Sequence, residues 1–357
     1  MKSILVTGLC TLHWGRLQYG NIGNYYIVEP LFRQLHKHFK DYRILTTFQM
    51  DETFVQKENI EILPMDLYYS WSDDDVERAK RDVDVAEKYS KGEECVLTGY
   101  IKALLECEYV IDVSGDMWGD NAEHVGHQRF LVDCLKMKAA QILKRKTILY
   151  AVTPGPFSKA DENAIAKDVF EKFDLVLVRE KVSLKNLQKW GYSTKNVKWA
   201  PCPSFLFEPN AAYSSKWTQE IERKHAEGEK VIGFTFGGFN MPVGPYDMWP
   251  RDEKQYEVFL QLIEHIVHNL HAHVVLFSHT NGFDLPPHFK LINGRDFIIL
   301  ERFYQIIMEH MPELQSHVTL IDEPLLPCDI KKVISEMDML ITGRVHASVA
   351  ATSMCVP

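Results

Sequence analysis

The sequence predicts an α/β fold made of two doubly wound domains that face a cleft. Short apolar segments typical of buried parallel strands alternate with longer amphipathic segments typical of helices. The alternation is interrupted once, by the polar stretch 208–229, and then restarts. Glycine, arginine, histidine and aspartate follow several of the strands, at the edge where open parallel sheets bind their ligands.

Length and composition fit a two-domain globular enzyme. The chain has 357 residues, of which 46% are hydrophobic and 25% charged, and its formal net charge of −9 argues against a general nucleic-acid binder. The seven cysteines include no C-x-x-C pair, so we expect a reduced, cytoplasmic chain without a disulfide framework or a zinc module. The N-terminus reads as a strand rather than a signal peptide, and no apolar run is long enough for a membrane span. Any membrane association would be peripheral.

The N-terminal domain is predicted to occupy residues 1–207. Residues 51–73 are expected to be rich in loops, and a glycine-containing loop at 20–24 is expected to open the first helix. The predicted strands are 4–6, 43–48, 109–113, 147–152 and 175–180, and the predicted helices are about 25–39, 74–91, 96–107, 129–145, 161–172 and 181–190.

The C-terminal domain is predicted to occupy residues 208–357, with 208–229 as a polar linker at its start. The chain stops at Val356-Pro357, where a further strand should begin, so we expect this domain to be incomplete at its end. The predicted strands are 231–238, 273–279, 318–322 and 338–342, and the predicted helices are about 253–270, 300–310, 328–336 and 346–354.

The last strand and helix frame a candidate anion site. Gly343 ends the strand, and Arg344 and His346 lie on the turn into the helix. The N–H groups of a helix N-terminus favour an anion, a guanidinium offers a fork for phosphate or carboxylate, and histidine titrates near neutral pH. The alternative is that Arg344 and His346 only cap and solvate the helix start.

Two further strands end in candidate site residues. Arg179 ends strand 175–180, with Ser183 one turn into the following helix, and the alternative for Arg179 is an ion pair with a neighbouring acid. His279 ends strand 273–279 at the corresponding edge of the second domain.

Two loops complete the candidates. In SGDMWGDN, residues 114–121, Asp116 and Asp120 could accept hydrogen bonds from sugar hydroxyls or act as a base, or they could stabilise turns. In GNIGN, residues 20–24, Asn21 and Gly23 lie in a loop between strand and helix that could cradle a phosphate. This loop lacks the Lys-Ser/Thr pair of a P-loop.

We expect no metal cofactor. The histidine-rich run HIVHNLHAH, residues 265–273, places two histidines on the flank of an apolar helix and two beyond its end, a spacing that does not suit one small metal site.

Several of these segments together resemble the polysaccharide pyruvyl transferase family. The resemblance is carried by Gly-Arg-Val-His at 343–346, by Val-Arg-Glu-x-x-Ser at 178–183 read with Leu187, by Gly-Pro-Phe at 155–157, and more loosely by GNIGN and SGD. The chain departs from the family pattern at three positions. Asn24 and Cys202 stand where the family has Asp, and Ser114 replaces a Gly.

The resemblance implies a glycosyltransferase-B-like arrangement and transfer of the carboxyvinyl group of phosphoenolpyruvate to two hydroxyls of a sugar, giving a pyruvate ketal and phosphate. Such a site needs cationic anchors, for which Arg179 and Arg344 are the candidates, and a general acid, for which His346 is the first choice and His279 the second. Asp116 or Asp120 would accept the sugar proton. No other cofactor is implied.

Two other functions stay open at this point. A nucleotide-sugar-dependent glycosyltransferase would need a ribose-binding carboxylate, for which Asp322 and Glu323 are candidates. The departures at residues 24, 114 and 202 would also suit a non-catalytic sugar- or anion-binding protein on the same fold. The sequence does not identify the acceptor, whether a lipid carries it, or the oligomeric state.

Overall fold

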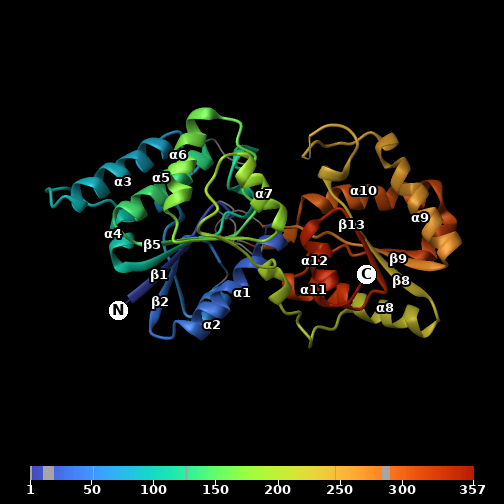
Figure 1. Cartoon of the computed structure of the whole chain (residues 1–357). Coiled ribbons are helices and arrows are strands. Elements are labelled where there is room, and N and C mark those ends of the chain that lie inside the picture. The colour runs from blue at the N-terminus through green and yellow to red at the C-terminus, as the bar shows by residue number, and fades with distance from the viewer. Residues whose placement is uncertain (1, 11–19, 51, 125–127, 246, 284–289) are drawn as a thin grey trace. The chain divides into compact units, whose positions relative to one another are not determined.

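The computed structural model shows two compact α/β units (Figure 1). It describes the chain except for residues 1, 11–19, 51, 125–127, 246 and 284–289. Among the described residues, unit 1 contains residues 2–10 and 27–203, and unit 2 contains residues 20–26 and 204–357. The predicted α/β class is therefore confirmed.

Unit 1 is built on a seven-stranded parallel sheet in the order β3-β2-β1-β4-β5-β6-β7. Its central strands are apolar and buried on both faces, as a sheet covered by helices on both sides requires. The chain winds from β1 outward in one direction and then in the other, so β1 and β4 flank the switch point. The strands are β1 (Lys2–Thr7), β2 (Tyr42–Thr46), β3 (Ile60–Ile62), β4 (Cys107–Asp112), β5 (Lys146–Val152), β6 (Leu175–Val178) and β7 (Val197–Trp199).

Helices cover both faces of this sheet. In Figure 1, α5, α6 and α7 lie over one face and α1 and α2 over the other. The core under α5 and α6 centres on the fully buried Trp118, whose ring packs against Phe130 and Phe170 at centroid distances of 5.2 and 5.3 Å. The helices are α1 (Ile22–His38), α2 (Glu52–Glu58), α3 (Asp75–Ser90), α4 (Gly99–Glu106), α5 (Arg129–Ile142), α6 (Ala160–Lys172) and α7 (Lys181–Lys189).

Unit 2 is built on a four-stranded parallel sheet in the order β12-β9-β8-β13, so its switch point lies between β8 and β13. A short antiparallel hairpin, β10 (Asn281–Phe283) and β11 (Leu291–Asn293), follows the second strand. The parallel strands are β8 (Lys230–Thr235), β9 (Ala272–Leu276), β12 (Val318–Leu320) and β13 (Met339–Thr342).

The helices of unit 2 bury two separate apolar clusters. α9 and α10 contribute to one cluster, which contains Phe236 and Phe303, and α8, α11 and α12 contribute to the other, which contains Trp217. Tyr26, from the first turns of α1, also belongs to the second cluster, where its ring stacks on Phe207 at 4.5 Å. The helices are α8 (Lys216–Ala226), α9 (Glu257–Leu270), α10 (Arg295–His310), α11 (Pro327–Ser335) and α12 (Val345–Ser353).

The structure corrects the prediction in three segments. Residues 51–73 contain α2 and β3, and the supposed linker 208–229 contains α8. A capping box at Ser215 starts α8, and the buried side chains of Trp217 and Ile221 hold the helix on the sheet. The polar residues that suggested a linker lie mainly on the outer face of this helix. Helix α10 begins at Arg295, five residues before the predicted start at 300.

No helix of the described chain is long and apolar enough to cross a membrane.

Candidate active site

The switch point of unit 2 brings together the segments that follow β8 and β13. β8 continues into Gly237 and Gly238, and β13 continues through Gly343 into the first turn of α12. Register between the two strands runs from Met339 opposite Ile232 to Thr342 opposite Thr235, so both segments leave the sheet at the same edge. This is the edge at which open α/β sheets bind ligands.

Arg344 is held at this edge by a buried carboxylate. Its Nε donates to Asp296 Oδ2 at 2.8 Å, and its Nη2 donates to Asp296 Oδ1. Asp296 is 1% exposed and lies in the first turn of α10, whereas the Arg344 side chain is 21% exposed. Burial raises the pKa of Asp296, and the Arg344 guanidinium opposes that rise. The ion pair therefore orients Arg344, whose side chain stays partly exposed.

Glycine is needed beside this pair. A Cβ on Gly237 would lie 2.1 Å from Asp296 Oδ1 and 2.9 Å from Arg344 Nη2, so any side chain there would displace the pair. A Cβ on Gly343 would lie 2.0 Å from Asn240 Nδ2, and Asn240 Oδ1 accepts a hydrogen bond from the Gly237 N–H at 3.0 Å. The predicted site residue Gly343 thus makes room for the loop after β8.

His346 packs against the first turn of α1, which begins at Ile22 inside the stretch 20–24 that we predicted to be a loop. A Cβ on Gly23 would lie 2.2 Å from His346 Nδ1, so the imidazole occupies the space that this glycine leaves. Asn21 Oδ1 accepts a hydrogen bond from the Gly23 N–H at 3.0 Å, and Asn21 forms an antiparallel bridge with Thr280. Asn21, Gly23 and His346 are predicted site residues that the fold brings together. We expected residues 20–24 in the N-terminal half, but the structure groups them with unit 2.

His279 is a poor proton donor. It is 1% exposed, its ring lies edge-on to Tyr26 at 5.6 Å, and its Nε2 has no hydrogen-bond partner among the residues described. Burial, together with the positive charges of His346 and Arg344, lowers the pKa of His279 to about 3. The imidazole is therefore neutral near pH 7 and fully covered by protein, which is unfavourable for the role of general acid.

The carboxyl edge of unit 1 carries the other predicted arginine. Arg179 is 13% exposed, and its Nε donates to Thr153 Oγ1 at 2.7 Å. Its Nη2 would lie 3.9 Å from a Cβ placed on Gly115, so it lies beside the loop after β4. Glu180 is 3.9 Å from Arg179 Nε, and Ser183 Oγ donates to Glu180 Oε1 at 2.5 Å. Ser183 is buried, and its hydrogen bond to Glu180 stabilises the start of α7.

The two candidate aspartates of this loop differ. Asp120 Oδ2 accepts a hydrogen bond from the Ser158 N–H at 2.7 Å, which ties two loops together, as expected of a turn-stabilising aspartate. Asp116 is exposed, and its carboxylate makes no hydrogen bond or ion pair to any residue that the structure describes. Asp116 is therefore the better candidate for contact with a substrate hydroxyl.

A buried acid pair lies behind this loop, and the sequence analysis missed it. Asp112, at the end of β4, and Asp133, on α5, are both 0% exposed. Ser114 Oγ donates to Asp112, Tyr68 donates its hydroxyl proton to Asp133 Oδ1 at 2.5 Å, and the Leu9 N–H donates to Ser114 Oγ at 2.9 Å. Burial raises the pKa of both carboxyls, so the folded pair retains a proton. Ser114 therefore has a structural role at its departure from the family pattern.

The carboxylates proposed for ribose binding are engaged elsewhere in unit 2. Glu323 Oε1 accepts a hydrogen bond from Trp217 Nε1 at 2.6 Å, and Asp322 Oδ1 accepts one from Lys216 Nζ at 3.3 Å. Both therefore bind the first turn of α8. Within the described chain, no group of three or more His, Cys, Asp or Glu side chains is arranged to hold a metal ion.

Asp296 is the site residue that sequence reasoning passed over. It lies in the segment NGRDF, where Gly294 precedes the first turn of α10, and we had begun this helix five residues later. An aspartate in a first helical turn after glycine is a helix-start signal, and recognising it would have placed Asp296 at the carboxyl edge of the sheet.

Comparison with solved structures agrees with this fold. A putative UDP-N-acetylglucosamine 2-epimerase from Listeria monocytogenes superposes with a TM-score of 0.59 at 12% identity, covering 100% of this chain and 78% of that one. The UDP-GlcNAc 2-epimerase from Methanocaldococcus jannaschii gives 0.59 at 13% identity, covering 100% of this chain and 82% of that one. At such identities the likeness shows the fold alone, a glycosyltransferase-B-like pair of α/β units. A search of curated protein sequences found no match.

The fold is thus of the glycosyltransferase-B-like class. A family model for polysaccharide pyruvyl transferases matches residues 21–357, nearly the whole chain. This chain belongs to the polysaccharide pyruvyl transferase family, as its motifs predicted, and its activity is pyruvyl transfer to a sugar or glycan acceptor.

Proposed function

We propose that the donor is phosphoenolpyruvate and the product a pyruvate ketal of the acceptor sugar. In this reaction C3 of the donor gains a proton and C2 forms bonds to two sugar oxygens. The C2–O bond to the phosphate breaks. Of the two hydroxyl protons, one balances the proton added to C3 and the other leaves with the phosphate. No redox change occurs, and no cofactor other than the donor is required.

The observation that carries this proposal is the fixed Arg344 beside His346 at the switch point of unit 2. Because Asp296 neutralises much of the charge of Arg344, the guanidinium is suited to orient one anionic group rather than to attract several. The N–H groups at the start of α12 offer a second interaction for an anion. Phosphoenolpyruvate carries a phosphate and a carboxylate, which match two such interactions.

His346 is the general acid in this proposal. It opens α12 two residues after Arg344, it is partly exposed, and Gly23 leaves space for its ring. A bound phosphate and carboxylate would favour the protonated imidazole, since opposite charges stabilise the charged form. The N-terminus of α12 acts against a cation, so the ring should become protonated mainly when the donor is bound.

The acceptor is assigned to the carboxyl edge of unit 1. Asp116 is exposed there and can accept the proton of a sugar hydroxyl, while Asp120 holds the loop in place. Arg179 lies beside the same loop and remains our candidate for a further anionic group. None of the seven cysteines, all of which the structure describes, forms a disulfide, which fits our proposal that the protein works in the reducing cytoplasm.

The test is incubation of the protein with phosphoenolpyruvate and a panel of glycosides, with phosphate release and the mass of the glycoside as readouts. We expect one phosphate released for each pyruvate-sized mass gain. Phosphate release without a mass gain would indicate hydrolysis. Transfer of a sugar from a nucleotide-sugar, with phosphoenolpyruvate inert, would replace the proposal by the glycosyltransferase alternative.

A further inference from the structure

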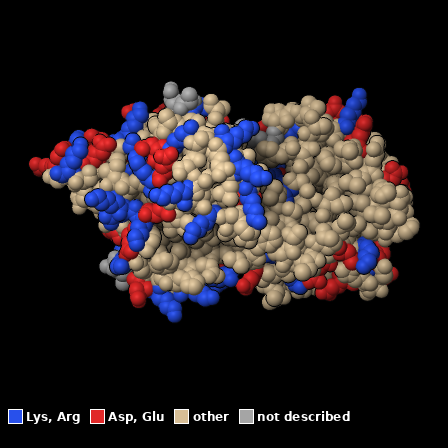
Figure 2. Space-filling view, in the orientation of Figure 1, with Lys and Arg blue, Asp and Glu red and all other residues tan. Residues whose placement is uncertain are grey.

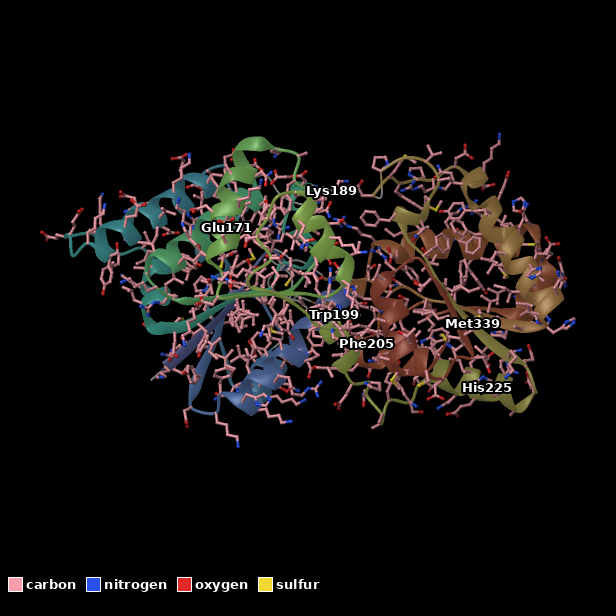
Figure 3. The ribbon with its side chains drawn as sticks, viewed as in Figure 1. Glu171, Lys189, Trp199, Phe205, His225 and Met339 are labelled. Carbon is pink, nitrogen blue, oxygen red and sulfur yellow. The ribbon has the colours of Figure 1, made fainter. Side chains whose placement is uncertain are left out.

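Helix α7 in unit 1 carries a stripe of lysines. Lys181, Lys185 and Lys189 are exposed and follow one another at four-residue spacing, which places them along one side of the helix. Figure 2 shows basic side chains gathered over α7, and Figure 3 labels Lys189 at the end of this helix. The opposite side of α7, with Ser183 and Leu187, is buried.

The stripe is not neutralised by neighbouring acids. Helix α7 itself contains no Asp or Glu, and none of the three lysines is within ion-pair distance of a carboxylate among the residues described. Glu180, which precedes the helix, already accepts the Ser183 hydroxyl proton. Helix α3 is different, since Lys80 and Lys88 pair with acids of the same helix. On a chain of net charge −9, an unpaired stripe of this kind indicates a partner of negative charge.

Apolar side chains accompany the lysines. Val182 is 54% exposed on α7, and Trp199 is 44% exposed at the end of the edge strand β7, where Figure 3 labels it. Lys181 Nζ lies 4.6 Å from the centroid of the Trp199 ring, so the aromatic and the cationic groups form one surface. We name Lys181, Val182, Lys185, Lys189 and Trp199 the α7 surface.

We propose that the α7 surface docks on a bilayer that contains anionic phospholipid. Lysine ammonium groups are attracted to the negative potential of such a membrane, and tryptophan partitions into the interface between headgroups and acyl chains. A nucleic acid would also be attracted to the lysines, but it would not explain why the apolar side chain of Val182 is exposed beside them. The negative net charge of the chain also opposes binding of a long polyanion. The surface thus fits a peripheral contact rather than an insertion.

The position of the α7 surface gives this docking a use. Helix α7 begins two residues after Arg179, at the same sheet edge as Asp116, to which we assign the acceptor. If that assignment holds, docking would bring the carboxyl edge of unit 1 to acceptors carried by a membrane lipid. This use of the docking rests on the proposed function, whereas the docking itself does not.

Co-sedimentation with vesicles tests the docking without any activity measurement. The full-length protein is mixed with vesicles of phosphatidylcholine alone or with about a third phosphatidylglycerol, at low and high salt. We expect binding only to the anionic vesicles, weakened by salt because screening shortens the reach of the lysine charges. The variant K181Q/K185Q/K189Q should bind about 10²-fold more weakly. Trp199→Ala should bind several-fold more weakly.

The matched control is K80Q/K88Q/K91Q, which removes the same charge from exposed positions in and just after α3 and should bind like the unmodified protein. Thermal unfolding checks that each variant is folded. The proposal is overturned if the unmodified protein does not bind anionic vesicles, or if the triple variants of α7 and α3 bind them equally. Binding to soluble heparin without binding to vesicles would also overturn it.

Discussion

The switch points of the two units present opposite chemistry. At unit 2 the edge carries Arg344, which the buried Asp296 orients, and His279, which burial keeps neutral. At unit 1 the buried groups are two carboxyls, Asp112 and Asp133, whose pKa values burial raises, and the exposed group is the carboxylate Asp116. We therefore propose that the two similar sheets bind different ligands, an anionic donor beside Arg344 and the acceptor hydroxyl groups beside Asp116.

The largest effect that this contrast predicts is on the rate of transfer. His346→Gln keeps a hydrogen-bond donor of similar size but cannot deliver a proton at neutral pH, so kcat should fall about 10²–10⁴-fold. Affinity for phosphoenolpyruvate, measured by calorimetry, should stay within a few-fold. Equal losses of binding and rate would make His346 an anchor. A normal rate would move the acid to another residue.

Gly23→Ala is the structural counterpart of that variant. The new methyl group would meet the His346 ring, so the rate should fall without any change to the imidazole itself. Gly99→Ala, also in the first turn of a helix, meets only the end of the Leu67 side chain and serves as the control. If both alanine variants turn over equally, the position of His346 against Gly23 does not matter for catalysis.

Arg344→Ala should weaken phosphoenolpyruvate binding by about 1.5–3 kcal/mol, the range for a lost charge-assisted hydrogen bond. Calorimetry measures this directly. The matched variant is Arg33→Ala, which removes an arginine from the Arg33–Glu29 pair in the unit 1 part of α1 and should leave the affinity unchanged. Unchanged affinity in Arg344→Ala would remove this residue from the donor site.

Asp296→Asn should have a smaller effect than loss of Arg344 itself. The amide keeps the shape of the carboxylate but supplies only one acceptor, so the guanidinium keeps its charge and loses its orientation. We expect an increase of about tenfold in KM for phosphoenolpyruvate, with the guanidinium still able to bind. Gly237→Ala, which would displace the same pair, should produce the same change. A KM unaffected by either variant would contradict the positioning role of Asp296.

The two units should also respond in opposite directions to pH. Burial lowers the pKa of His279 to about 3 and of His273 to about 4, below the ordinary value near 6.5, so the unfolded chain binds more protons below that pH and unit 2 loses stability as pH falls. Burial raises the pKa values of Asp112 and Asp133, so unit 1 loses stability as pH rises through them. Each proton contributes at most about 1.4 kcal/mol per pH unit.

Urea unfolding at pH 5, 6.5 and 8 measures these trends. His279→Asn should lose less stability between pH 6.5 and 5 than the unmodified protein, and Asp112→Asn should lose less stability than the unmodified protein as pH rises. Parallel pH dependences in all three proteins would show that these buried groups do not set the acid and base limits of the two units.

The smallest expected effect is that of metal removal. Since the proposed reaction needs only an acid, a base and anion anchors, activity should survive exhaustive chelation. Activity abolished by chelation and restored by Mg²⁺ or Mn²⁺ would favour a nucleotide-sugar reaction, in which a metal commonly neutralises the diphosphate.

Much of the fold was predictable because it depends on periodicity along the chain. The strands and helices around Arg179 and Arg344 were placed within a few residues, since buried parallel strands read as short apolar runs. Helix α8 was missed because most of its residues are polar, and only burial of Trp217 and Ile221 marks its inner face.

The sequence by itself determined the alternation of strands and helices, the family, and which edges of the sheets carry Arg179, Arg344 and His346, because each of these depends on local order along the chain. Only the tertiary structure showed that Asp296 orients Arg344, that Gly23 packs on His346 from about 320 residues away, and that His279 is buried and neutral. Which residue contacts Arg344 or His346, and whether His279 is buried, depend on which segments meet in space. The spacing of residues along the sequence does not determine this.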